Sequence, residues 1–204
     1  MTHRVKNEII KASEKDIPLL ADILAQAFDN DPCFLYMFRN DSKRKVALTS
    51  FFSFTLENAY SDGEVYASKN YEACSIWYPP GKGYFDDSEE RISALKPMMI
   101  EWATEEKINR LFDVMKLFTQ RPTVSHGYLS YIAVKPMFQG RGLGTYLLRE
   151  KLLDFDRENI PVYLENTNPL NTPLYERFGF KFVNEFRIGE NGPPILSMWR
   201  EPEG

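Results

Sequence analysis

The sequence has few cysteines and histidines, no surplus of basic residues and no long apolar run, and each of these shortages excludes a class of protein. Of its 204 residues, two are cysteine and two are histidine. Cys33 and Cys74 have no histidine at a spacing typical of a zinc site, so we expect no metal, and a chain of this length needs no disulfide. A net charge of −4 argues against nucleic acid as a partner, because nucleic acids are bound through neutralisation of their phosphates.

The apolar residues occur only in short segments. No run approaches the ~20 residues that a transmembrane helix requires, and the charged segment 1–16 has no apolar core of the kind that defines a secretory signal. We therefore expect a cytoplasmic protein with no membrane partner. Hydrophobic residues make up 43% of the chain and charged residues 26%, values that are typical of a folded domain and not of a disordered or collagen-like chain.

The pattern of apolar residues predicts alternating helices and strands. Helical spacing predicts helices, segments rich in Val, Tyr and Ile predict strands, and we expect Asp31-Pro32 to break the chain and Pro97 to interrupt a helix. The predicted helices cover 14–28, 41–60, 88–120, about 147–155 and 168–178, and the predicted strands cover 7–12, 64–68, 71–78, 128–134, 161–165, 180–188 and 195–200.

A strand, a helix and a second strand follow one another between His126 and Glu165. This order is a βαβ crossover, which makes the two strands parallel neighbours in one sheet. Antiparallel hairpins are expected before and after that pair. The sequence therefore predicts a mixed α/β fold.

A glycine-bearing turn, 139–144, lies between the first strand of this unit and its helix. Glycines let the backbone approach an anion closely, and a helix N-terminus offers free N–H groups, so the turn indicates a phosphate-bearing ligand. No Gly-Lys-Ser/Thr follows, which excludes a P-loop. A dinucleotide fingerprint would place its third glycine at Leu147, which is too large for close packing. The alternative is that the glycines only make a tight turn.

Two motifs resemble the GNAT acetyltransferase superfamily. The first is Gln139-x-x-Gly142-x-Gly144 after the strand that ends at Val134, which resembles the acyl-CoA signature of that superfamily. The second is Asn171 with 174–180, which resembles the superfamily's N…YxxxGF segment. The two motifs stand in the order and at the separation that the superfamily shows.

The likeness extends to the branch of the superfamily that contains puromycin N-acetyltransferase. It covers most of the chain, while 81–123 matches only in general helical character. The resemblance implies a single GNAT domain over 1–204, in which the helical insert 81–123 shapes the acceptor pocket. The matching pieces are Ala27-Phe28, Asp31-Pro32, Ile76-Trp77, 139–144, 163–166 and 171–177.

The resemblance also implies a fold and a co-substrate. The sheet would be mixed and mostly antiparallel, flanked by helices, with a central parallel pair that splays apart to admit acetyl-CoA. Backbone groups at the end of the first strand would pair with the pantetheine arm, and the amides of the glycine turn would hold the pyrophosphate. The implied cofactor-binding residues are Ile132, Ala133, Val134, Gln139, Gly140, Arg141, Gly142, Leu143, Gly144, Thr145 and Asn171.

Acetyl transfer to an amine requires two proton movements. An alkylamine with a pKa of ~10.4 must lose a proton before it attacks, and the departing thiolate must be protonated. Tyr175 occupies the position that the superfamily uses for the general acid, and its alternative is core packing. Glu165 ends the second parallel strand, where a carboxylate can accept the amine proton or hold the ammonium, and its alternative is an ordinary carboxylate at a strand end.

The resemblance implies an N-acetyltransferase that moves an acetyl group from acetyl-CoA to a primary amine of a small molecule, by direct attack in a ternary complex. Phe28, Tyr36 and Trp77 are expected to line the acceptor pocket, with core packing as their alternative. The rival functions are a protein lysine or N-terminal acetyltransferase and a non-catalytic CoA-binding regulator. The sequence predicts neither the acceptor nor the oligomeric state.

Overall fold

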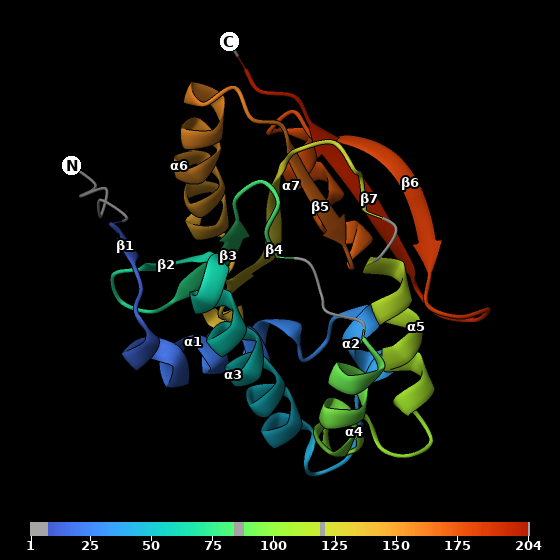
Figure 1. The fold of residues 1–204 in the computed structure, drawn as a ribbon. Coiled ribbons are helices and arrows are strands. Elements are labelled where there is room, and N and C mark those ends of the chain that lie inside the picture. Colours follow the sequence, from blue (N-terminus) through green and yellow to red (C-terminus); the bar gives the residue numbers. More distant parts are fainter. Residues whose placement is uncertain (1–7, 84–87, 119–120, 204) are drawn as a thin grey trace.

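The protein forms a seven-stranded sheet with helices on both faces, in a computed structural model that describes residues 8–83, 88–118 and 121–203 (Figure 1). The strands are β1 (Ile9–Lys11), β2 (Glu64–Ser68), β3 (Ala73–Tyr78), β4 (Gly127–Val134), β5 (Val162–Asn166), β6 (Lys181–Arg187) and β7 (Pro194–Arg200). The α-helices are α1 (Ile17–Phe28), α2 (Pro32–Met37), α3 (Arg44–Asp62), α4 (Glu89–Ala103), α5 (Ile108–Phe118), α6 (Leu143–Arg157) and α7 (Thr172–Glu176).

The strand order is β1-β2-β3-β4-β5-β7-β6, and β4 and β5 form the one parallel pair in the described sheet. All other neighbouring strands run antiparallel. The helix α6 connects β4 to β5, as a parallel crossover requires. The predicted mixed, mostly antiparallel α/β fold with a central parallel pair is therefore confirmed.

The parallel pair is short. Gly127, Tyr128 and Leu129 pair with β5, and within the described residues the remainder of β4 pairs only with β3. The two central strands thus separate after Leu129, as predicted. The edge of β4 that faces the gap keeps backbone groups with which none of the described strands pairs.

A β-bulge lies where the strands separate. Ile76 pairs with Tyr131 but its neighbour Trp77 pairs with Leu129, so Ser130 is one additional residue on β4. A bulge bends a strand and changes the face to which later side chains point. As a result, Tyr128 and Tyr131 both join the core on the same face of the sheet.

The helices divide into two layers. The helices α1 and α3 cover one face of the sheet, and α6 covers the other (Figure 1). Tyr128 packs in the first layer, while Leu129 packs with Leu148 and Phe155 of α6 in the second. The helices α4 and α5 extend the first layer, and they are the helical segment expected within 81–123.

Two details refine the sequence prediction. The chain breaks before Pro32 as expected, between α1 and α2, but Asp31-Pro32 also begins α2: the Asp31 carboxylate accepts hydrogen bonds from the N–H groups of Cys33 and Phe34, and Pro32 takes the first helical position, where no N–H is needed. Pro97 lies inside α4, and the interruption comes instead at Thr104, which has a φ of 87°. The prediction of a break at Pro97 was therefore wrong by about two helical turns.

Candidate active site

A cavity of about 410 Å³ lies between the first helix layer and the point where β4 and β5 separate. This volume is within the range of small-molecule sites. Its walls come from α2, α3, α4 and α5, and its floor comes from β4 and β5. The described lining residues include Cys33, Phe34, Met37, Phe38, Phe51, Phe54, Thr55, Asn58, Asp62, Arg91, Leu95, Met99, Trp102, Leu111, Val114, Met115, Arg121, Tyr128, Ser130, Tyr131, Glu165, Thr167 and Ile195.

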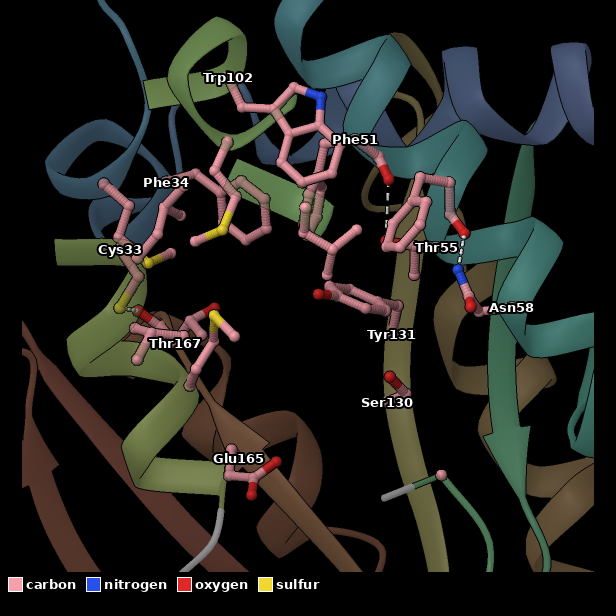
Figure 2. Close-up of a pocket in the computed structure, with 18 of the residues that line it drawn as sticks. Cys33, Phe34, Phe51, Thr55, Asn58, Trp102, Ser130, Tyr131, Glu165 and Thr167 are labelled. Atoms are coloured by element: carbon pink, nitrogen blue, oxygen red, sulfur yellow. Dashed lines mark hydrogen bonds between the residues drawn. The ribbon is translucent and has the colours of Figure 1, made fainter. Parts of the chain in front are cut away.

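The cavity has a polar end and an apolar end. Figure 2 shows Glu165 at one end and Trp102 with Phe51 at the other. Ser130 and Tyr131 form one side wall between these ends, and Cys33 and Thr167 form the opposite wall. The polar end therefore coincides with the gap between the central strands.

Glu165 is held by a buried charge network. Arg121 Nε lies 2.9 Å from Glu165 Oε1, and the Tyr128 hydroxyl donates to Glu165 Oε2 at 2.7 Å. Arg121 also donates to the Gly83 carbonyl at 2.8 Å and lies 3.8 Å from the centre of the Tyr128 ring. The side chains of Arg121 and Glu165 are only 6% and 8% exposed. Arg121 thus ties the insert to β5.

Arg121 and Tyr128 both keep their protons at neutral pH. Burial opposes the charged form of Arg121, but Tyr128 and Glu165 outweigh burial and hold the pKa of Arg121 above its usual value. Burial raises the pKa of Tyr128 far above the ordinary tyrosine value. A protonated tyrosine and a guanidinium therefore face the Glu165 carboxylate.

Tyr175 lies in the second layer, on the α6 side of the sheet, in a buried cluster with Leu148, Phe155 and Phe180. Its side chain is 6% exposed, and its ring packs edge-on against Phe180 at 6.0 Å. Burial raises the pKa of Tyr175, and the charge of Asp31 adds to the shift, so its hydroxyl stays protonated at neutral pH. Asp31 in turn accepts from Thr167 Oγ1 at 2.7 Å, which links Tyr175 electrostatically to the cavity wall.

The glycine turn leads into α6 as predicted. Gly140 and Gly142 have φ angles of 75° and 83°, which favour glycine, and nothing lies within 4 Å of where a Cβ would stand on either. Gly142 is the N-cap of α6 and offers no side chain to cap it, so the N–H groups of the first turn remain available to an anion. Gln139 Nε2 donates to the Val134 carbonyl at 3.1 Å and joins the turn to β4.

The other expected cofactor residues lie around the same gap. Ile132, Ala133 and Val134 are on β4 beyond the last β5 partner, and Ala133 pairs with Cys74 of β3. Asn171 is exposed and directly precedes α7, the helix that carries Tyr175. The structure thus joins the β4 end to the glycine turn, while Asn171 lies beside the end of β5, where Asn166 Nδ2 donates to Thr172 Oγ1 at 3.1 Å.

The expected acceptor residues lie elsewhere. Trp77 is fully buried under α6, 5.8 Å from Phe155, and its Nε1 donates to Ser75, so it packs in the layer opposite the cavity. The ring centres of Phe28 and Phe34 lie 4.9 Å apart, and the guanidinium carbon of Arg110 lies 4.3 Å from the centre of the Tyr36 ring. These three residues are not among the described lining residues, so core packing accounts for them.

Sequence reasoning missed most of the cavity. Its apolar walls come from α3, α4 and α5, where apolar residues at helical spacing fit an ordinary core equally well. Arg121 directly follows the predicted helix 88–120, and no sequence signal links it to Glu165, which is 44 positions away.

The described residues contain no group of three His, Cys, Asp or Glu side chains placed to hold a metal ion. None of the helices in the described ranges combines the length and the apolar character that a membrane crossing demands.

Comparison with known proteins defines the class of protein. Residues 102–182 match the family model described as acetyltransferase (GNAT) domain. A curated N-acetyltransferase of Schizosaccharomyces pombe, named as uncharacterised, is 25% identical over 95% of this chain and 83% of its own length. The protein is therefore an acyltransferase, and its residues 102–182 are similar to the GNAT acetyltransferase domain.

Solved structures share the fold. One, described as histone acetyltransferase HPA2 and related acetyltransferase from Corynebacterium glutamicum, has a TM-score of 0.71 and 23% identity, over 97% of each chain. Another is the PaiA N-acetyltransferase from Thermoplasma acidophilum in complex with coenzyme A, with a TM-score of 0.58 and 12% identity, over 97% of this chain and 99% of the other.

Proposed function

We propose that the protein transfers an acetyl group from acetyl-CoA to a primary amine of a small molecule, by direct attack in a ternary complex. The observation that carries the proposal is the coincidence of two features: the free edge of β4 after Leu129 and the polar end of the cavity. A thioester at that edge would meet an amine in the cavity. We also propose that the chain is a single domain of the puromycin N-acetyltransferase branch, in which 81–123 shapes the acceptor pocket.

The co-substrate supplies an activated acetyl group, and the residues around the turn fit its shape and charge. The open space above Gly140 and Gly142 admits a pyrophosphate to the first N–H groups of α6. The backbone of Ile132–Val134 can add the pantetheine arm as an extra strand. Binding through backbone donors lets a protein of net charge −4 hold an anion locally. A coenzyme A complex of the Thermoplasma relative supports this assignment.

We place Tyr175 as the general acid. The burial that raises its pKa keeps the proton on the hydroxyl at neutral pH, and that proton can pass to the departing sulfur. Cys33, a thiol in the cavity wall, has its pKa raised by burial and by Asp31, which disfavours a thiolate nucleophile. Direct attack by the amine needs no such nucleophile.

We place Glu165 at the amine. A carboxylate has about four lone-pair sites. Arg121 donates to both Glu165 oxygens, at 2.9 Å to Oε1 and 3.5 Å to Oε2, and Tyr128 donates to Oε2. The lone-pair capacity that remains on the carboxylate can accept an N–H of the ammonium and orient the nitrogen toward the gap. We propose that the displaced proton leaves through water. We also propose a cytoplasmic location, which the free, buried thiols of Cys33 and Cys74 support.

The test is thiol release from acetyl-CoA with a panel of amines and peptides, together with calorimetric binding of acetyl-CoA. Gly142→Val should weaken acetyl-CoA binding about tenfold or more. The valine side chain would prevent or displace one charge-assisted hydrogen bond between a backbone N–H and the pyrophosphate. Gly81→Val is the matched control: Gly81 has a φ of 78° and open space around it, but lies in the turn after β3.

Equal affinities of the Gly142 and Gly81 variants would contradict the phosphate placement. Acetyl-CoA binding with no thiol release by any amine or peptide would favour a CoA-binding regulator. Release by peptides alone would favour a protein acetyltransferase.

A further inference from the structure

We propose that the acceptor is an amphipathic monoamine: one primary amine on a compact aromatic or branched apolar body. The inference deepens the proposed function and rests on it. It follows from three properties of the cavity: its apolar end, the separation of that end from the gap between β4 and β5, and the balance of charge in its described lining.

The apolar end is an aromatic cage. Trp102 packs edge-on against Phe51 at 5.3 Å, and Phe51 packs edge-on against Phe34 at 5.8 Å. Trp102 Nε1 donates to Ser50 Oγ at 3.1 Å, so the one polar atom of the indole already has its partner. Leu95 and Met99 complete this end. The walls here offer a ligand apolar contact and little hydrogen bonding.

The amine has one place to react. Under the proposed function it must reach the gap, which lies at Ser130, Tyr131 and Glu165 (Figure 2). The rest of an acceptor then extends toward Phe51 and Trp102. A body that buries apolar surface there gains binding energy, about 25 cal/mol for each Å².

The charges of the described lining balance. Arg121 faces Glu165, and Arg91 donates to Asn58 and lies 5.6 Å from the Phe54 ring. Asp62 is the other charged lining residue among those described. A polyamine or aminoglycoside would bring two or more ammonium groups to walls with no surplus of negative charge, and an unpaired buried ammonium is costly.

The first experiment compares acceptors by kcat/KM in the thiol-release assay. Phenethylamine and 3-phenylpropylamine represent the proposed class, and putrescine, spermidine, kanamycin and a lysine peptide represent the others. We expect the two arylalkylamines to exceed every polycation and the peptide by about 30-fold or more, the worth of ~2 kcal/mol of apolar burial. A higher kcat/KM for any polycation or for the peptide would overturn the inference and leave acetyl transfer intact.

The second experiment tests the apolar end itself. Trp102→Ala should raise KM for phenethylamine about tenfold or more while acetyl-CoA affinity stays within about twofold, because the indole is remote from the glycine turn. Trp199→Ala is the matched control, since Trp199 packs on His126 at 5.6 Å, outside the described lining. Trp102→Phe, which retains a ring, should restore most of the affinity if the alanine variant folds poorly.

The outcomes separate the two proposals. An unchanged KM for phenethylamine in folded Trp102→Ala and Trp102→Phe overturns the inference about the acceptor. Absence of thiol release with every amine, while acetyl-CoA binds, contradicts the proposed function and the inference with it.

Discussion

The two halves of the candidate site are built in different ways. The proposed acetyl-CoA half, formed by the end of β4 and the first turn of α6, offers mainly backbone groups, and its two left-handed glycines leave open space above the turn. The cavity half is built from side chains of α2, α3, α4 and α5 together with Glu165 and Arg121. Binding through backbone groups restricts the residue type at few positions, whereas binding through side chains restricts it at many.

This difference teaches which half can change. A turn that binds through N–H groups depends on glycine at defined positions and tolerates other changes nearby. A cavity lined by apolar side chains changes shape with each substitution. We expect acceptor preference to vary through the cavity half, while the other half stays the same.

The largest effect should come from Tyr175→Phe. This substitution tests whether the half of the site that carries α6 and α7 supplies the proton donor. Loss of the hydroxyl removes the proposed proton donor, so turnover should fall by about 10²–10⁴ while acetyl-CoA affinity stays nearly intact. Steady-state kinetics and calorimetry measure the two quantities. Tyr60→Phe is the matched control, because the Tyr60 hydroxyl donates to the Ser13 carbonyl at 2.8 Å and Tyr60 is not among the described lining residues. Unchanged turnover would remove Tyr175 from the mechanism.

Glu165→Gln should have the next largest effect. It tests whether the stability of the cavity half depends on the buried ion pair of Glu165 and Arg121. The substitution removes the carboxylate that faces the Arg121 guanidinium, and breaking such a pair costs about 3 kcal/mol of unfolding free energy. Urea unfolding measures the loss. Arg121→Gln combined with Glu165→Gln should cost less than the sum of the two single changes. Additive losses would show that the two residues act independently.

The smallest effect concerns the scaffold of the acetyl-CoA half. Burial opposes ionisation of Glu64, but Lys11 and Lys151 outweigh burial and lower its pKa to about 2 from 4.5. A lowered pKa stabilises the fold fully above about pH 4.5, and the contribution is lost as the pH falls toward 2. Glu64→Gln should therefore cost about 1 kcal/mol at pH 7, after allowance for its partial exposure.

Urea unfolding across this pH range checks the Glu64 prediction, with exposed Glu158→Gln as control. The difference between Glu64→Gln and the parent chain should shrink steadily below pH 4.5. A difference that does not depend on pH would assign the cost to packing of the Glu64 side chain.

The sequence predicted the two halves unequally. The glycine turn could be predicted because an anion-binding turn requires glycines at short, fixed intervals along the chain. The crossover followed from the order of the predicted elements, and the separation of the parallel strands from the resemblance to the GNAT superfamily. The cavity could not, because its residues extend from Cys33 to Ile195 and each apolar side chain also fits a core. Trp77 shows the limit: a strand pattern gives alternation but does not say which face a residue joins. The roles of the individual site residues stay predictions.

The additional residue at Ser130 has a consequence for how the chain tolerates changes in length. Side chains alternate along a strand, so deletion of one residue at this point would turn over every side chain from Tyr131 to Val134. Tyr131 would leave the cavity wall and Ile132 would enter it. Such a deletion would therefore disable both halves at once, whereas insertions at the turn 79–83, which pairs with no strand among the described residues, would leave the alternation of β4 unaltered.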